Sequence, residues 1–269
     1  MVLLLLAIGA FAVALSAGSV SVDWTDVLQG LNGRDLSVDY TVVFQLRLPR
    51  AVTAFVVGGT LGLAGVLMQI LLRNPLADPY VLGVSGGAAV AALLAILIGW
   101  HMIGISGAAA VGALASMFLV FVLSRGQGDW STTRLLLTGV VLAAGWGAVV
   151  SFILAVSPDA HVRGMLFWLM GDIRETFPGW VRLGILMTSL LVAYCFARSL
   201  NLLSLGELRA ESLGVNTTLV RIGLFFMAGL LTASAVTLAG AIGFVGLVVP
   251  HMVRLWGGSD HRLVLPGSV

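Results

Sequence analysis

Residues 79–124 read PYVLGVSGGAAVAALLAILIGWHMIGISGAAAVGALASMFLVFVLS, a run of 46 residues without a charged side chain. A helix that crosses the hydrocarbon core of a bilayer needs about 20 apolar residues. The run is therefore too long for one crossing, and Gly99, Gly104 and Gly107 interrupt it near its middle. The stretch predicts two membrane-spanning helices joined by a short turn.

Five other charge-free stretches flank this run: residues 1–22, 51–72, 135–158, 183–197 and 222–253. The last holds 32 residues and is broken by Gly240 and Gly243, so it predicts two crossings, the second a short one at about residues 244–256. The stretch 183–197 reaches crossing length if it starts at Trp180 and the Arg182 head extends to the membrane surface. Backbone groups cannot stay unpaired in lipid, so all eight predicted spans are helices.

The composition agrees with a membrane protein. Of the 269 residues, 59% are hydrophobic and 10% are charged, and the mean hydropathy is +1.08; a soluble domain has about 25% charged residues. All 14 basic residues are arginine, and the absence of lysine excludes a GxxxxGK[ST] nucleotide loop and a Schiff-base lysine. The single Cys195 excludes an intrachain disulfide, and a net charge of +2 does not suggest a nucleic-acid partner.

The predicted spans contain no Asp or Glu. Carriers coupled to protons or sodium usually keep ionisable groups near the membrane midplane. Transport by this chain would therefore be passive or draw its energy from another subunit. The arginines divide eight to six between the two sides, and the richer side is predicted to be cytoplasmic; it holds residues 73–78, 125–134, 198–221 and 254–262.

Two polar segments on that side lie next to spans. Residues 73–79, RNPLADP, carry two prolines that forbid a continuous helix, so we expect a rigid loop with Asn74 capping the preceding helix. Ser131, Thr132 and Thr133 come directly before a span, where such residues commonly cap a helix N-terminus.

A third polar segment, residues 204–214, reads SLGELRAESLG and predicts a short surface helix. Ser204 and Glu207 have capping-box spacing, and Gly214 suits a left-handed C-terminal cap. Glu207 and Glu211 share one face of this helix because they are four residues apart. On spacing alone, a solvated connector explains the segment as well as a functional helix does.

At these positions the chain resembles the FecCD-type permeases, the membrane subunits of ABC importers for cobalamin, ferric siderophores and haem. The likeness covers nearly the whole chain, in the family's order. Its five motifs are QLRLPR at 45–50, MQ at 68–69 with NPLADP at 74–79, LGVSGG at 82–87, residues 206–214, and LAGAIGFVGLVVPH at 238–251.

The resemblance implies an all-α, polytopic membrane protein, the transmembrane subunit of a type II ABC importer. Residues 1–269 would form a single permease domain, with residues 204–215 as a cytoplasmic coupling helix within it. The family pattern has ten spans, of which eight are visible here. The chain stops at residues 266–269, where a ninth span would begin, so we expect that two spans of the pattern are missing.

The resemblance also implies roles for single residues. Arg47 and Arg50 would face the periplasm and meet acidic residues of a binding protein. Asn74, Leu76, Ser131, Thr132 and Thr133 would form the cytoplasmic gates. The residues expected to couple the permease to its ATPase are Glu207, Leu208, Arg209, Ala210, Glu211, Leu213 and Gly214.

The partners that the resemblance implies are a second copy of the permease, two ABC ATPase subunits, a periplasmic substrate-binding protein and the lipid bilayer of the bacterial inner membrane. No nucleic-acid partner is expected. ATP and magnesium would bind to the ATPase, so we expect no cofactor and no catalytic residue in this chain. The cargo would be an iron chelate, haem or cobalamin.

The four histidines lie in four different segments without ligand spacing, so no metal site is expected. His161 and Arg163 precede residues 165–170 in a predicted periplasmic segment and are candidates to contact haem or an anionic chelate. A helix lying at the membrane surface explains the same residues.

Three alternatives stay open on the residues alone. A secondary transporter built of inverted repeats would also contain a short broken helix, although the missing intramembrane acid counts against it. A membrane-embedded enzyme would need a nucleophile and a base, and no HExxH, GxSxG or paired carboxylate occurs in any predicted span. Residues 1–19 also fit a secretory signal, but no basic region precedes them.

Overall fold

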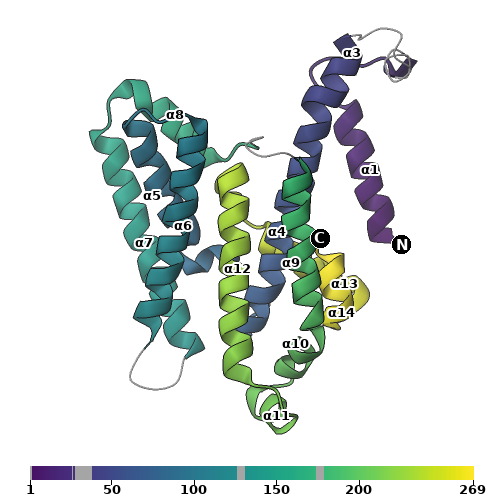
Figure 1. Ribbon diagram of the computed structural model, residues 1–269, viewed down its shortest axis with the longest axis vertical. Coiled ribbons are helices and arrows are strands. Elements are labelled where there is room, and N and C mark those ends of the chain that lie inside the picture. The colour runs from purple at the N-terminus through teal and green to yellow at the C-terminus, as the bar shows by residue number, and fades with distance from the viewer. Residues whose placement is uncertain (1, 26, 28–37, 126–130, 174–178) are drawn as a thin grey trace.

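The computed structural model describes residues 2–25, 27, 38–125, 131–173 and 179–269. All regular elements in these ranges are helical (Figure 1). They are α1 (Val2–Ser16), α3 (Val38–Thr41), the π-helix η1 (Val42–Arg47), α4 (Leu48–Leu71), the 3₁₀ helix η2 (Pro79–Leu82), α5 (Val84–Leu97), α6 (Met102–Ser124), α7 (Thr132–Val156), α8 (Asp159–Met170), α9 (Gly179–Cys195), α10 (Ala197–Ser204), α11 (Glu207–Ser212), α12 (Thr217–Ala239), α13 (Val245–Gly257) and α14 (His261–Gly267).

A helix lies at each of the eight places where the sequence predicts a span. Among the described residues, four helical stretches are long and apolar enough to cross a membrane alone: Val38–Leu71, Met102–Ser124, Thr132–Val156 and Thr217–Ala239. The pair α9 and α10, bent by 57°, makes a fifth if it is one span. The helices α1, α5 and α13 have only 15, 14 and 13 residues. Length and composition alone therefore support four or five of the eight predicted spans among the described residues.

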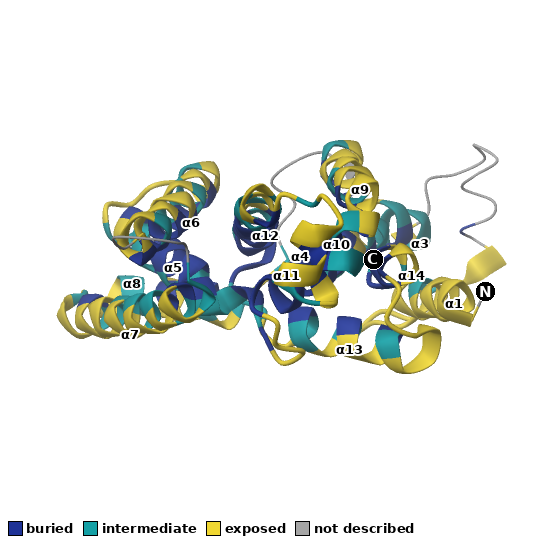
Figure 2. Ribbon diagram, turned by 90° about the horizontal axis from the view of Figure 1, so that it is seen from below, coloured by how far each residue is buried: buried dark blue, intermediate teal, exposed yellow. Residues whose placement is uncertain are grey.

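The helix α4 forms the centre of the bundle. Every residue from Gly59 to Leu71 is buried, as expected for a helix that is apolar on all sides. The helices α9, α12 and α13 surround it, as the view along the bundle shows (Figure 2). The helices α5, α6, α7 and α8 form a second group, and α12 packs between this group and α4.

Glycines permit the closest helix contacts. A Cβ atom added at Gly65 of α4 would overlap the carbonyl oxygen of Gly246 in α13, so these two helices touch backbone to backbone. Gly145 and Gly147 of α7 have no neighbouring atom within 4 Å of an added Cβ. The helix α7 instead keeps an apolar surface open, since only 11% of its most apolar window is buried.

The rigid loop predicted at residues 73–79 lies only in part at the surface. Leu76 is 64% exposed, but Ala77 and Pro79 are buried. Val81 lies against Gly139, which is seven residues into α7 and therefore about 10 Å inside the bundle. The chain thus re-enters the bundle before α5 starts, and this explains why α5 is short.

Candidate functional site

One end of the bundle, which we call the α11 end, gathers the three polar segments that the sequence predicted to be important (Figure 1). The short helix α11 lies between α10 and α12. The loop after α4 and the start of α7 lie at the same end. The opposite end, which carries α3 and α8, is called the α8 end.

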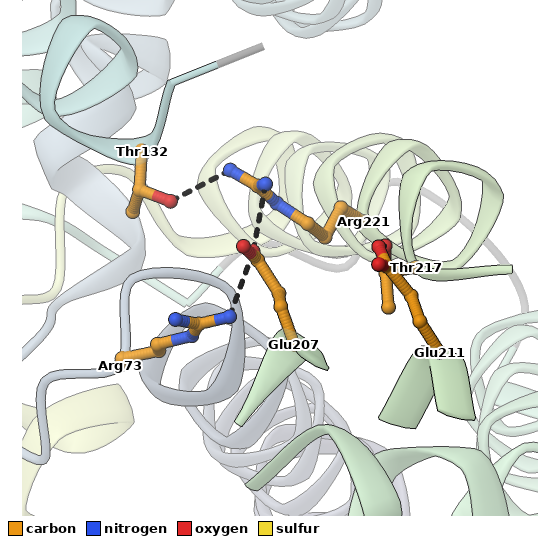
Figure 3. Close-up of polar contacts among 6 residues, drawn as sticks. All are labelled: Arg73, Thr132, Glu207, Glu211, Thr217 and Arg221. Atoms are coloured by element: carbon orange, nitrogen blue, oxygen red, sulfur yellow. Dashed lines mark hydrogen bonds and ion pairs between the residues drawn. The ribbon is translucent and has the colours of Figure 1, made fainter. Parts of the chain in front are cut away.

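Four side chains from four segments meet at the α11 end (Figure 3). Glu207 Oε1 lies 2.7 Å from Nη2 of Arg73 and accepts a hydrogen bond from Nη1 of Arg221 at 2.8 Å. The other terminal nitrogen of Arg221, Nη2, donates to Thr132 Oγ1 at 2.7 Å. We call these residues, Arg73, Thr132, Glu207 and Arg221, the coupling cluster.

The coupling cluster joins the loop after α4, the first residue of α7, the first residue of α11 and the second turn of α12. The side chain of Arg221 is 13% exposed, that of Glu207 33% and that of Arg73 44%. Hydrogen bonds with an ionised partner are stronger than neutral ones, and partial burial limits their screening by salt. These contacts link α11 directly to the loop after α4 and, through Arg221, to the start of α7.

The remaining contact on this face is made by Glu211, whose Oε1 accepts from Thr217 Oγ1 at 2.6 Å. Glu207 and Glu211 thus share a face of α11, as predicted, and both bond to α12. Gly214 has φ 84°, as predicted for a left-handed cap, and Val215 N donates to Ala210 O at 3.0 Å.

The predicted capping box at the start of α11 is wrong. The N-cap position is occupied by Gly206, with φ 109°, and no side chain caps it. Ser204 is instead the last residue of α10, where its hydroxyl donates to Asn201 O at 2.7 Å. Glu207 is consequently free of a capping role and available to the two arginines.

The other face of α11 points away from the bundle. Leu208 is 84% exposed and Leu213 is 61% exposed, and Arg209 is exposed as well, whereas Ala210 is fully buried against the bundle. The predicted coupling residues therefore divide into a face bonded to the bundle and a face open to a partner.

The loop after α4 is held in one conformation by local bonds. Arg73 adopts φ 49°, a left-handed conformation that is strained for a residue with a side chain. Asn74 N donates to Gln69 O, and Asn74 Oδ1 accepts from Leu76 N at 2.9 Å. The prediction that the Asn74 side chain caps α4 is therefore wrong. This side chain instead closes the turn that exposes Leu76.

Of the three polar residues predicted to precede this span, Thr132 and Thr133 are the first two residues of α7. Ser131 occupies the N-cap position but makes no capping bond with its side chain. Thr132 belongs to the coupling cluster, and Thr133 is exposed. The structure therefore gives Thr132 a polar contact across the bundle and leaves Thr133 open at the surface.

The two predicted docking arginines lie at the α8 end and have different surroundings. Residues 38–50 are helical, so both arginines lie on helices. Arg47 Nη1 donates to Leu15 O at 2.8 Å and to Ser16 O at 2.9 Å, which caps the carbonyl end of α1. Arg50 has a side chain that is 66% exposed, and its Nη2 lies 3.8 Å from Asp172 Oδ1.

His161 and Arg163 lie on α8, also at the α8 end. Arg163 is exposed, while His161 Nδ1 is buried and has no hydrogen-bond partner among the described residues. In the part of the chain that the structure describes, no group of three or more His, Cys, Asp or Glu side chains is arranged to hold a metal ion.

Sequence reasoning named Arg73 only as part of a loop and missed Arg221. Residues 217 and 221 repeat the four-residue spacing of residues 207 and 211 on the other side of the Gly214 turn, so each pair lies on one face of its helix. This spacing alone does not show that the two faces meet.

Comparisons with known proteins give one consistent result. The model of the FecCD transport family matches residues 4–269. The vitamin B12 import system permease protein BtuC of Klebsiella pneumoniae is 38% identical over 232 residues, which is 84% of this chain and 69% of the relative. BtuC of Escherichia coli O1:K1 is 38% identical over 231 residues, 84% of this chain and 70% of the relative.

Two solved structures have a similar fold. An ABC transporter described as being of "metal-chelate type", in an inward-facing conformation, superposes with a TM-score of 0.84 at 32% identity, over 99% of this chain and 83% of the other. PsaBC from Streptococcus pneumoniae superposes with a TM-score of 0.55 at 20% identity, over 91% of this chain and 82% of the other, and this likeness concerns the fold alone.

Proposed function

The chain belongs to the FecCD transport family, and on that premise we propose that it lines the path by which an ATP-driven importer moves an iron chelate, haem or cobalamin across the bacterial inner membrane. Family membership makes the chain a multi-pass membrane permease of the ABC type. The observation that carries the proposal is the TM-score of 0.84 with a transporter of metal-chelate type over 99% of the chain. The similar BtuC permeases, named for vitamin B12 import, keep cobalamin among the cargo candidates.

Permeases of this kind depend on ATPase partners. For this chain we propose two ATPase subunits, a second permease copy and a periplasmic binding protein, with ATP and magnesium bound to the ATPase and no catalytic role for the permease. The exposed apolar face of α7 supports pairing with a second copy, because only 11% of its apolar window is buried. The α11 end would face the cytoplasm and the α8 end the periplasm.

We assign the contact with the ATPase to the outward face of α11. Leu208 and Leu213 supply exposed apolar side chains, and Arg209 supplies a charge at their edge. On the inward face, Glu207 and Glu211 bond to α12, and Ala210 packs against the bundle. Movement of the ATPase cleft would shift α11, and the coupling cluster would carry this shift to the segments beside the pore.

These segments are the proposed gates. Leu76 projects from the loop after α4, and Ser131 to Thr133 begin α7. Arg73 and Thr132 link each of these segments to α11 through Glu207 and Arg221. A gate connected in this way would stay closed while no nucleotide moves the ATPase.

At the periplasmic side, Arg50 is the better candidate to meet carboxylates of a binding protein, since it is exposed and its one described ion pair is long. Arg47 would act indirectly by holding α1 against η1. His161 and Arg163 remain candidates for contact with an anionic chelate that leaves the binding protein, and the exposed guanidinium of Arg163 is the more accessible of the two.

Transport by the complete assembly tests the proposal. Vesicles with the permease, its ATPase and its binding protein should accumulate a labelled ferric siderophore, haem or cobalamin when ATP is supplied on the ATPase side. A proton ionophore should leave this accumulation unchanged. Accumulation that collapses with the ionophore while ATP is plentiful would instead establish a coupled secondary carrier.

A further inference from the structure

Arg182, in the first turn of α9, is buried in a surrounding that is nearly all apolar. The sequence predicted that its head would extend to the membrane surface, but the residue is only 3% exposed. Its Nη1 donates to Thr53 Oγ1 of α4, whose own hydroxyl donates to Pro49 O at 2.7 Å. Its Nε is buried and has no hydrogen-bond partner among the described residues.

A charge buried in this way is costly unless an anion compensates it. None of the ion pairs in the described part of the chain includes Arg182. Ser106 in the second turn of α6 is in the same situation, because it is 2% exposed and its hydroxyl has no partner among the described residues. Two buried hydrogen-bond donors therefore lack acceptors at one place.

Both residues line one cavity of about 340 Å³ between α6, α9 and α12. Its polar lining lies at the α8 end, where Arg182 starts α9 and Thr237 lies in the last turn of α12. From there the cavity continues toward Leu230, seven residues earlier in α12 and thus about 10 Å deeper along the helix. This deeper part is apolar, with Ala110 and Leu114 on the side of α6.

The cavity is open at an apolar rim. Ile103, Ile185 and Leu230 line it and are 67%, 45% and 53% exposed, so its rim is as apolar as a surface in contact with lipid chains. The cavity has a cation at one end and an apolar channel along the rest of its length. This arrangement matches a phospholipid, which has an anionic phosphate at one end and apolar acyl chains. Guanidinium groups bind phosphate through two parallel hydrogen bonds, and Arg182 Nε is available for one of them.

We propose that this cavity binds one phospholipid of the leaflet at the α8 end, with its phosphodiester group on Arg182 and Ser106 and an acyl chain along Ala110 and Leu230. The site lies on the side of α6, α9 and α12, apart from the coupling cluster and from the proposed gates. The proposal depends on the membrane setting only, and the identity of the cargo does not enter it.

Native mass spectrometry of the permease bound to its ATPase tests this site. The probes are dioleoylphosphatidylglycerol, dioleoylglycerol, which lacks the phosphate, and inorganic phosphate. The unmodified permease should retain one dioleoylphosphatidylglycerol molecule that R182Q loses, with retention falling at least about tenfold, as expected for a lost hydrogen bond to a charged group. R163Q, which removes an exposed arginine at the same end, should retain it. Dioleoylglycerol should not be retained.

A second variant covers the case that R182Q fails to fold. A110F keeps Arg182 but fills the apolar part of the cavity, and it should also lose the lipid. Retention unchanged in both R182Q and A110F would overturn the proposal, and displacement of the lipid by inorganic phosphate would show an anion site in place of a lipid site. Glu175 lies outside the described residues, so the variant E175Q is included as well. Unchanged lipid retention in E175Q supports the proposal. A clear rise in retention would show that this carboxylate already neutralises Arg182, and would overturn the proposal.

Discussion

Arg221 Nη1 donates to Glu207 Oε1 at 2.8 Å, and this single bond ties the second turn of α12 to the first residue of α11. Glu207 Oε1 also lies 2.7 Å from Arg73, so two guanidinium groups share one carboxylate oxygen. The side chain of Arg221 is 13% exposed, which shields the bond from salt more than a surface pair would be shielded. The proposed ATPase contact and the proposed gates are therefore separated by only one or two hydrogen bonds.

Replacing Glu207 by Gln should uncouple transport from ATP hydrolysis. The amide is neutral, so the attraction to both arginines is lost, while the outward face of α11 stays intact and still binds the ATPase. Cargo imported per ATP should fall about fivefold or more, as for a typical coupling free energy. Glu211→Gln is the matched control, because Glu211 bonds only to Thr217 among the described contacts and should change this ratio little. An unchanged ratio in Glu207→Gln would mean that α11 acts on the gates by another route.

A double-mutant cycle isolates the bond between Glu207 and Arg221. Thermal unfolding of Glu207→Gln, Arg221→Gln and the double variant should give non-additive changes, with an interaction free energy of about 0.5–3 kcal/mol for residues in one network. Additive changes would show that the contact contributes nothing to the stability of the permease.

Replacing Leu208 by Glu should weaken binding of the ATPase without affecting the bundle. Leu208 is 84% exposed and has no role in the core, so the melting temperature of the permease alone should not change. Association measured by surface plasmon resonance should weaken at least about tenfold, because a charge would replace a buried apolar contact at the interface. Thr218→Glu adds the same charge at a nearby exposed position and controls for electrostatics alone.

The two arginines at the α8 end should behave differently. Arg50→Glu should slow association of the loaded binding protein about tenfold at low salt and leave stability unchanged, since Arg50 is mainly exposed. Arg47→Gln should instead lower the free energy of unfolding by about 1.5–3 kcal/mol, because hydrogen bonds from a charged group to the end of α1 are lost. Equal effects of both variants on association would restore a shared docking role.

Charge-free stretches predicted the helices well because a bilayer excludes charges from long segments whatever their packing. The breaks at Gly99 and Gly240 were also predictable, and both glycines have positive φ, which residues with a side chain rarely adopt. The re-entry of residues 77–83 into the bundle was not predictable, because prolines indicate where a helix stops and give no information on depth.

The contacts of individual arginines could not be predicted from the sequence, for a related reason. Arg47, Arg182 and Arg221 all looked like membrane-edge charges, yet one caps α1, one is buried beside Thr53 and one bonds to Glu207. Such long side chains reach groups several residues away, so their partners depend on how helices pack rather than on local spacing. The face of α11 that bears Glu207 was predictable, but the arginines opposite it were not.

Two glycines of α4 provide the last prediction, which concerns the centre of the bundle. A Cβ atom at Gly65 would overlap the carbonyl oxygen of Gly246, whereas a Cβ atom at Gly58 would meet nothing within 4 Å. Gly65→Ala should therefore force α13 away from α4 and lower the free energy of unfolding by about 1–3 kcal/mol. Gly58→Ala should leave it unchanged or raise it by up to about 1 kcal/mol, since alanine favours a helix interior. Thermal unfolding of the two variants in the same detergent measures the difference, and equal melting temperatures would show that α4 and α13 do not touch at Gly65.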